Sequence, residues 1–471
     1  MNRFRNSICA LLALSMAACS GSKKETVATG DVELWLTTGD RTHLFEKVAG
    51  PLFADIEFKG PVIEVDTSVT YQTMDGFGYS LTGGSAYHIN QKLDSATRSK
   101  LLHELFSTEG NSIGISYLRI SIGASDLDDH VFSYNDLPKG QVDLKLEKFT
   151  LDEDRKNLIP VLKQILAIDP SIKIMGSPWS PPAWMKTNNS PKGGYLKPEY
   201  YSVYAAYLAR YIQEMAKEGI TIDAITLQNE PENPKNNPSL LMTAEQQAEF
   251  IRDHAGPLFR QQGIAARIVL FDHNCDHPEY PITVLNDPEA RQYVDGSAFH
   301  LYLGEIEALT KVHDAHPDKN LYFTEQWTSP QGTFDGDLRW HVRNLVAGAP
   351  RNWSRVVLEW NLAADADFQP HTDQGGCTEC LGALTIQDLS VTRNVAYYII
   401  AHASKFVRPG SVRVQSNIVD DLYNVAYLTP SGKRVLVVVN DSDEEKRFAI
   451  AYKGKKAETI LPAASVGTYV W

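Results

Sequence analysis

From residue 74 to about residue 400, short apolar runs alternate with longer amphipathic stretches, and the alternation occurs eight times. A strand followed by a helix, repeated in this way, is typical of a parallel sheet covered by helices. Eight such units over about 330 residues predict a (β/α)₈ barrel, an α/β fold. The predicted strands are Gly76–Ser80, Ile115–Ser121, Ile172–Ser177, Ala224–Gln228, Arg267–Asp272, Ser297–Tyr302, Leu321–Glu325 and Val356–Trp360.

Amphipathic patterns between these strands predict the helices. Thr243, with Gln246 three residues later, has the pattern of a capping box. The alternative is an open doubly wound sheet, but Asp75-Gly-Phe-Gly-Tyr lacks the glycine spacing of a dinucleotide-binding loop. The predicted helices include Ser95–Phe106, Glu153–Ile168, Pro198–Glu218, Thr243–Gln262, Asp335–Ala347 and Ser390–Ala403.

The two ends of the chain are rich in short β-type runs separated by turn residues. We therefore expect a small antiparallel β-sandwich beside the barrel, formed mainly by residues 406–471, with strands contributed by residues 32–73. The barrel would then occupy residues 74–405. The predicted sandwich strands are Ser411–Gln415, Val425–Leu428, Val435–Asn440, Phe448–Tyr452 and Val466–Trp471, with Val32–Leu36 and Val62–Val65 from the other end.

The first 31 residues have the pattern of a targeting segment. Arg3 and Arg5 precede the apolar run Ile8–Ala18, which is too short to span a bilayer as a mature helix. The run ends in Met16-Ala-Ala-Cys19, which resembles a bacterial lipobox. We expect residues 1–18 to be a signal peptide, Cys19 to carry lipid, and residues 19–31 to be a polar tether. The alternative is an ordinary secretory signal.

This pattern predicts an exported protein that is anchored at the bacterial outer membrane, on its periplasmic face or at the cell surface, and touches the membrane only through its lipid. The net charge of −13, from 45 Lys+Arg and 58 Asp+Glu, argues against nucleic acid as a partner.

Cys377 and Cys380 form a C-x-x-C without the further ligands of a zinc site, so we expect a local disulfide. The cluster Asp272-His-Asn-Cys-Asp-His277 contains potential metal ligands, but its spacing fits no standard site.

Two carboxylates follow apolar strands directly. Glu230 comes after the fourth predicted strand and Glu325 ends the seventh. In a barrel the functional side chains gather at the carboxyl ends of the strands, where two carboxyl groups can approach to about 5 Å, the separation that a retaining glycosidase needs. The alternative for each residue alone is an ion pair with a neighbouring cation. The other polar or aromatic residues at these ends are Arg119, Asp126, Trp179, Asn229, Asp272, His300, Tyr302 and Trp360.

Spaced motifs over the barrel region resemble glycoside hydrolase family 30, a family of retaining β-glycosidases that includes lysosomal glucosylceramidase and microbial β-1,6-glucanases. The motifs are Asp75-Gly-Phe-Gly, Leu118-Arg-Ile-Ser-Ile-Gly-Ala-Ser-Asp126, Ser177-Pro-Trp-Ser-Pro-Pro-Ala-Trp-Met-Lys186, Leu227-Gln-Asn-Glu-Pro231, Ala298-Phe-His-Leu-Tyr302, Phe323-Thr-Glu325 and Glu359-Trp-Asn-Leu-Ala363.

The resemblance implies a role for each matching position. Glu325 would be the nucleophile and Glu230 the acid/base, with no cofactor or metal. Asn229 would hold the 2-hydroxyl of the reacting sugar. The remaining substrate-binding positions would be Asp126, Trp179 and Trp360, while Arg119, His300 and Tyr302 would orient the carboxylates. Asp272 is expected to bind substrate too, because of its position at the end of the fifth predicted strand. Because the acid has to stay protonated, we expect Glu230 to have fewer cations around it than Glu325.

The predicted function is the hydrolysis of β-glucosidic bonds by double displacement. Two substrates are open: a β-1,6-linked glucan and glucosylceramide or a related β-glucoside. The Cys377–Cys380 loop departs from the lysosomal enzyme and resembles the members that cleave polysaccharides. The alternative outside the enzymes is a catalytically inactive lipoprotein that binds carbohydrate. A binding protein, however, has no need of two converging carboxylates.

Overall fold

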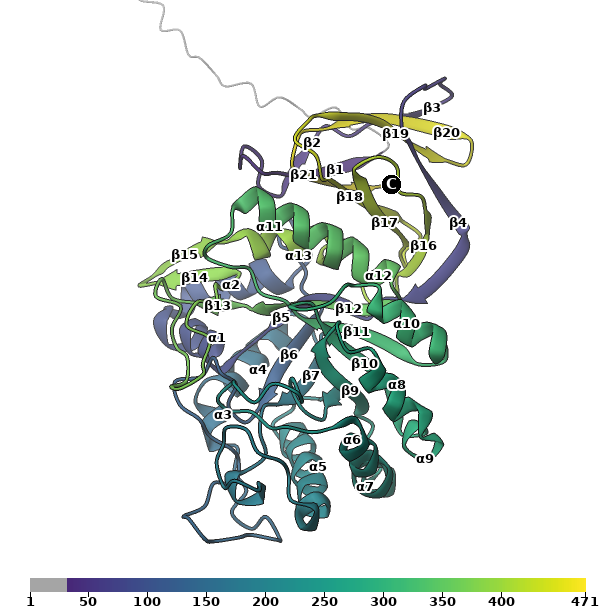
Figure 1. Ribbon diagram of the computed structural model, residues 1–471. Coiled ribbons are helices and arrows are strands. Elements are labelled where there is room, and N and C mark those ends of the chain that lie inside the picture. Colours follow the sequence, from purple (N-terminus) through teal and green to yellow (C-terminus); the bar gives the residue numbers. More distant parts are fainter. Residues whose placement is uncertain (1–31) are drawn as a thin grey trace, which may run out of the picture.

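The structure, a computed structural model, describes residues 32–471, so the predicted signal peptide, Cys19 and tether lie outside the described residues. Eight parallel strands close into a barrel in chain order, and helices surround it (Figure 1). This confirms the predicted (β/α)₈ fold. The barrel strands are β5 Gly76–Ser80, β6 Tyr117–Ile122, β7 Lys173–Pro178, β8 Ala224–Thr226, β9 Arg267–Asn274, β10 Val294–His300, β11 Asn320–Glu325 and β12 Ser354–Asn361.

The barrel strands are apolar because side chains fill the barrel inside and helices cover it outside. Every residue of β5 and β6 is buried. Large and small apolar side chains such as Tyr117, Ala224 and Tyr322 fill the interior. Gly78 in β5 permits the close approach of β6, since a Cβ at this position would lie 1.9 Å from the Tyr117 carbonyl oxygen.

The helices follow the strands as expected, with one correction. Thr243 and Gln246 form the predicted capping box at the start of α6. The last predicted helix, Ser390–Ala403, is wrong at its start, because residues 390–393 form a strand that pairs with residues 384–387. The helices are α1 Gly83–Tyr87, α2 Ser95–Phe106, α3 Asp152–Lys156, α4 Leu158–Ile168, α5 Tyr201–Lys217, α6 Ala244–Phe250, α7 Gly256–Gln262, α8 Glu279–Asn286, α9 Pro288–Arg291, α10 Ala308–Ala315, α11 Phe334–His341, α12 Ala349–Arg351 and α13 Val395–Ser404.

The remaining strands lie outside the barrel. Strands β13 Ala363–Ala364, β14 Leu384–Gln387 and β15 Ser390–Arg393 form a small three-stranded sheet that follows the barrel's eighth strand in the chain. The two chain ends form the separate β-domain that the sequence predicted, and it sits on α11 and α13 (Figure 1). Its strands are β1 Glu33–Thr38, β2 Glu46–Val48, β3 Phe53–Ala54, β4 Val62–Thr73, β16 Val412–Ser416, β17 Leu422–Leu428, β18 Arg434–Asn440, β19 Lys446–Tyr452, β20 Lys455–Leu461 and β21 Ser465–Val470.

A single long strand links the two halves of this domain. The twelve residues of β4 pair antiparallel with β16 at one end and parallel with β19 at the other. The sequence did not predict β20, which forms a hairpin with β19. Among the described residues, no helix is both long and apolar enough to cross a membrane.

The barrel and the β-domain meet at a buried histidine. His402 in α13 lies within hydrogen-bond distance of two hydroxyls of the β-domain, Thr37 Oγ1 at 2.8 Å and Thr468 Oγ1 at 2.9 Å. Burial lowers the pKa of His402 to about 3, so the ring is neutral in the folded protein. The domain junction therefore depends on an uncharged imidazole.

This junction predicts a specific sensitivity to acid. Unfolded His402 takes up a proton near its ordinary pKa of about 6.5, whereas the folded residue does not, so its contribution to stability falls as the pH drops below about 6.5. We expect His402→Gln to lose less stability between pH 7 and pH 4.5 than the unsubstituted protein, by on the order of 2 kcal/mol. Urea unfolding at the two pH values measures the difference, and an equal loss in both proteins would contradict it.

Candidate active site

The two predicted catalytic carboxylates meet at the carboxyl end of the barrel, with one imidazole between them. Glu230 lies in the turn after β8, Glu325 ends β11, and His300 ends β10. His300 Nδ1 is 3.2 Å from Glu230 Oε1 and 3.9 Å from Glu325 Oε1. The two oxygens are therefore at most about 7 Å apart, the sum of these distances. This limit accommodates the separation of about 5 Å that a retaining glycosidase uses.

Both oxygens of Glu325 are held by protein groups. Arg119 Nη1 donates a hydrogen bond to Oε2 at 2.7 Å, and the Tyr302 hydroxyl donates one to Oε1 at 3.0 Å. Burial raises the pKa of Glu325, and the positive charges of His300 and Arg119 only partly oppose this shift. The geometry fixes the carboxyl group in one orientation, as a nucleophile requires.

Glu230 is held by more donors than the sequence predicted. Its Oε1 contacts His300 Nδ1, and its Oε2 accepts hydrogen bonds from Asn233 Nδ2 at 2.7 Å and Asn236 Nδ2 at 3.1 Å. Burial alone would raise the pKa of Glu230, but the hydrogen bond and charge of His300, with His273 and Asn233, lower it to about 2. As expected, the guanidinium of Arg119 contacts Glu325 and not Glu230. The pKa values nevertheless run opposite to the expectation, because His300 lies closer to Glu230 and the pKa of Glu230 is lowered while that of Glu325 is raised.

Asp272 organises the floor of the site. It has no exposed surface, and its Oδ2 accepts from Arg119 Nη2 at 2.8 Å while its Oδ1 lies 3.0 Å from His300 Nε2. Three further hydroxyls donate to the same carboxylate, those of Ser177, Thr226 and Thr324. Asp272 therefore holds the two cations in place, which corrects the expectation that it binds substrate. Burial alone would raise its pKa, but Arg119 and His300 lower it well below the ordinary value.

Exposure separates the residues that can touch a substrate from those that support them. Arg119, Asp272 and His300 are completely buried, whereas Glu230 and Glu325 each keep 6% of their surface exposed. Three of the predicted residues thus lie beneath the two glutamates. They support the glutamates and expose no surface to a ligand.

The backbone around the site adopts sparsely populated conformations. Glu230 has a φ of +47°, and Phe271 and Asp272 have φ values of +73° and +63°. The register between β9 and β10 shifts at Ala298/Phe299, beside these residues. Such left-handed conformations of non-glycine residues cost on the order of 1–3 kcal/mol each and persist only where the surroundings impose them. They turn Asp272 into the barrel centre and Glu230 into its mouth.

Two predicted sugar-binding residues have free polar atoms at the mouth. Asn229 Oδ1 accepts from Arg119 Nη2 at 2.6 Å, which leaves its amide nitrogen for a ligand. Burial, followed by the negative charges of Glu325 and Glu230, raises the pKa of Asp126 to about 8. Asp126 is therefore protonated at neutral pH and can both donate to and accept from a sugar hydroxyl.

The two predicted sugar-binding tryptophans lie at the site, but their faces are covered. Trp179 and Trp360 stack with ring centroids 5.5 Å apart, and Arg119 lies 4.9 Å from the Trp179 ring. Cys377 and Cys380 are disulfide-bonded, and Cys380 packs in the same apolar cluster as the tryptophans. The Trp179 indole nitrogen is buried and has no hydrogen-bond partner among the described residues.

Glu230, His273 and His300 place three potential metal-ligand atoms within 4.8 Å of one another. Burial alone would lower the pKa of His300, but Glu325, Asp272 and Glu230 raise it to about 9. The two nitrogens of His300 are thus occupied by two carboxylates, Glu230 at Nδ1 and Asp272 at Nε2. The side chains of the sequence cluster Asp272–His277 do not converge on one point, because the His277 side chain is exposed and its Nδ1 lies 2.8 Å from Glu232 Oε2.

The sequence did not single out several residues of the site. Strand hydroxyls that hold Asp272 could have been found as polar residues at inward positions of apolar strands. The asparagines after Glu230 stand in an obvious run, Asn233-Pro-Lys-Asn-Asn-Pro238, but the turn geometry decides which of them face the carboxylate. The missed residues are Ser177, Thr226, Thr324, Asn233 and Asn236, while His273 was noted only as a member of the Asp272–His277 cluster.

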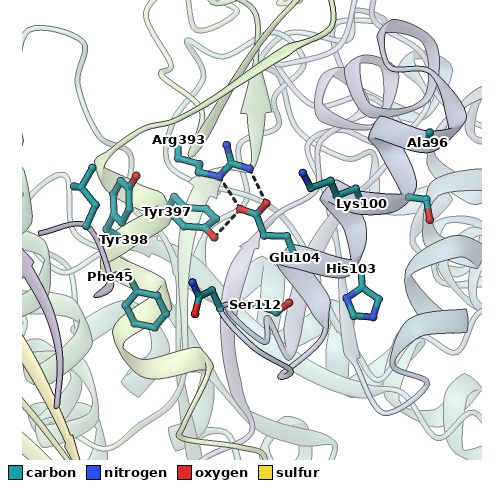
Figure 2. A pocket seen from close by; sticks show the side chains of 12 residues that line it. Phe45, Ala96, Lys100, His103, Glu104, Ser112, Arg393, Tyr397 and Tyr398 are labelled. Atoms are coloured by element: carbon teal, nitrogen blue, oxygen red, sulfur yellow. Dashed lines mark hydrogen bonds and ion pairs between the residues drawn. The ribbon is translucent and has the colours of Figure 1, made fainter. Parts of the chain in front are cut away.

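A cavity of about 790 Å³ lies away from these residues, between α2, α13 and the turn after β1. Figure 2 shows Arg393 and Tyr397 directed at Glu104 in its wall. Arg393 donates to both oxygens of Glu104 at 2.6 Å, and the Tyr397 hydroxyl donates at 2.8 Å. This carboxylate is fully occupied by a structural ion pair, so the cavity offers no pair of free carboxylates.

Comparison with known proteins gives a match over nearly all the described chain. Residues 74–407 match the glycosyl hydrolase family 30 TIM-barrel domain, and residues 410–469 match the glycosyl hydrolase family 30 beta sandwich domain. These two segments coincide with the barrel and with the C-terminal part of the β-domain.

Individual relatives agree with this match. The endo-1,6-beta-D-glucanase neg1 of Aspergillus fumigatus is 33% identical over 433 residues, covering 86% of each chain. The lysosomal acid glucosylceramidase of Mus musculus is 28% identical over 92% of this chain and 87% of its own. The solved endo-beta1,6-glucanase BT3312 superposes with a TM-score of 0.88 at 34% identity, covering 94% of this chain and 99% of that one.

Proposed function

We propose that this chain, which belongs to glycosyl hydrolase family 30 and is a β-glycosidase, cleaves internal bonds of a β-1,6-linked glucan by double displacement. The observation that carries the mechanism is the pair of carboxylates on either side of His300, one with a fixed orientation and one facing amide donors. The relatives with about one-third identity that are named endo-1,6-β-glucanases support the substrate.

In the first step Glu325 attacks the anomeric carbon of the sugar. The bond to the leaving oxygen breaks as Glu230 gives that oxygen a proton, and a glycosyl ester of Glu325 forms. The donors on Glu325, Arg119 and Tyr302, fix the direction of attack. Asn229 and Asp126 have the free polar atoms to hold the sugar hydroxyls.

In the second step water breaks the ester. Glu230, now ionised, accepts a proton from the water as the water oxygen attacks the anomeric carbon from the opposite side. The ester bond to Glu325 breaks, its carboxylate returns, and the sugar keeps its β configuration. Because Glu230 must lose and regain a proton in each cycle, its neighbours have to accommodate both states.

A panel of defined substrates tests this proposal. We expect β-1,6-glucan to give oligosaccharides of mixed length in its first products, as internal cleavage requires. β-1,3-glucan and glucosylceramide should react far more slowly. Release of single glucose units from chain ends would contradict internal cleavage. Preferential hydrolysis of glucosylceramide would favour the other substrate of the family, and no hydrolysis of any substrate would favour a binding protein.

We also propose that the protein is exported and anchored through a lipid on Cys19. The support is the sequence alone: a basic start, an apolar run and Met16-Ala-Ala-Cys19. A surface anchor suits an enzyme whose substrate is a polymer too large to enter the cell. Mass spectrometry of the protein from bacterial membranes should find diacylglycerol on an N-terminal Cys19. Soluble protein that begins after a different cleavage site would contradict the anchor.

A further inference from the structure

Two asparagine side chains contact the carboxylate that we assign as the acid. Asn233 Nδ2 and Asn236 Nδ2 both donate to Glu230 Oε2, at 2.7 Å and 3.1 Å. Both residues lie in the loop between β8 and α6, a few positions after Glu230 itself. This oxygen is therefore surrounded by hydrogen-bond donors, which stabilise a carboxylate more than a carboxylic acid.

The two amides differ in how firmly they are oriented. Asn233 Oδ1 accepts a hydrogen bond from the backbone N–H of Lys235 at 3.0 Å, so its nitrogen has to face Glu230. Among residues 32–471, no group donates to Asn236 Oδ1. The Asn236 amide can therefore turn over and present its oxygen to a protonated Glu230.

From this difference we propose that Asn233 and Asn236 are positioning residues for Glu230, Asn233 as a fixed donor that favours the ionised form and Asn236 as a reversible partner of both forms. The inference rests on the proposed role of Glu230 as acid/base. It assigns to this loop the task of setting the pH range over which the acid works.

The loop is braced by the segment that carries the disulfide. Asn237, unlike Asn233 and Asn236, turns away from Glu230 and donates to the carbonyl oxygen of Asp373 at 2.6 Å. The Thr372 hydroxyl donates to the carbonyl oxygen of Asn237. Within the loop, the Ser239 hydroxyl donates to the carbonyl oxygen of Asn236 at 2.6 Å. These contacts anchor the part of the loop that carries Asn236.

Other titratable groups also face Glu230 and are unchanged by substitutions in the loop. His300 on β10 and His273 on β9 lie 3.2 Å and 3.8 Å from its Oε1. Glu325 on β11 shares His300 with it. Tyr302 after β10 and Asp126 after β6 interact with its charge. Because these groups are coupled, the high-pH limb of activity reports the loss of a proton from the whole carboxylate pair.

The experiment compares pH profiles of kcat/KM on β-1,6-glucan. Asn233→Ala removes a donor from the ionised acid, so the high-pH limb should move up by about one pH unit. Asn233→Asp keeps the acceptor for Lys235 but places an anionic oxygen at Glu230, so the limb should move further. Asn236→Ala should move the limb less than Asn233→Ala, since it removes a partner of both forms.

Lys235→Ala is the matched control, because its exposed side chain lies in the same loop and the variant keeps the backbone N–H. Its limb should stay in place. If Asn233→Ala lowers kcat/KM but leaves the high-pH limb of the profile at the same pH, the proposal is overturned and Asn233 has only a structural role. A ¹³C NMR titration of labelled glutamate carboxyls, with Glu230 assigned from Glu230→Gln, gives the same comparison without turnover. It decides this inference even if the proposed substrate is wrong.

Discussion

Glu325→Gln is expected to lower turnover by on the order of 10⁵-fold, the largest loss that we predict for one substitution. An amide is too weak a nucleophile to form the glycosyl ester. The loss should be similar for glucan and for aryl β-glucosides, because every substrate passes through attack by this residue. Steady-state rates on both substrates measure it. Glu232→Gln, which removes an exposed carboxylate paired with His277, should keep its activity.

A 2-deoxy-2-fluoro β-glucoside with a good leaving group identifies the nucleophile directly. The fluorine slows both steps by destabilising the oxocarbenium-like transition state, while the leaving group restores only the first. The glycosyl ester should therefore accumulate. Peptide mapping should place it on Glu325, within Tyr322-Phe-Thr-Glu-Gln-Trp327. A label on Glu230 would mean that the roles of the two glutamates are exchanged. A product of inverted configuration in an NMR time course would rule out a covalent intermediate altogether.

The barrel strands could be predicted from sequence because the pattern that marks each strand lies within the strand itself. Each strand is a short apolar run that starts and ends within a few residues of its predicted limits, as with Leu321–Glu325 against the observed Asn320–Glu325. Burial on both faces of the sheet produces such runs. The carboxylates at the strand ends were visible for the same reason, since a charge directly after an apolar strand is conspicuous.

Elements defined by a partner strand were harder to predict. Residues 390–393 continue the pattern of the following helix, yet they form β15 because Asp388, with a φ of +53°, turns the chain back along β14. Strand β20 is likewise defined by its pairing with β19. Which strands pair depends on contacts between distant residues, so a local pattern gives no sign of it.

The site shows the same limit. The sequence predicted that Asp272 and His300 lie at strand ends. It did not show that the left-handed backbone of Asp272 would turn this side chain inward. It did not show either that His300 would lie closer to Glu230 than to Glu325. Differences of less than 1 Å decide which carboxylate a cation supports, and these depend on the packing of several strands.

Glu230→Gln is expected to lower turnover of β-1,6-glucan by about 10²–10⁴-fold, because the sugar leaving group needs a proton and glutamine has none to give. An aryl β-glucoside with a good leaving group needs little protonation, so its first step should be nearly unaffected. Its ester intermediate should then accumulate, since no base activates water.

Azide separates these steps, because it needs no base. In Glu230→Ala it should restore turnover of the aryl glucoside and give the β-glucosyl azide, by attack on the ester from the side that Glu230 occupied. In Glu325→Ala, azide would instead enter from the nucleophile's side and give the α-glucosyl azide. The anomer formed thus reports which face each carboxylate occupies. Equal losses on glucan and aryl glucoside, with no rescue by azide, would show that Glu230 is not the acid, and the donors around it would then need another explanation.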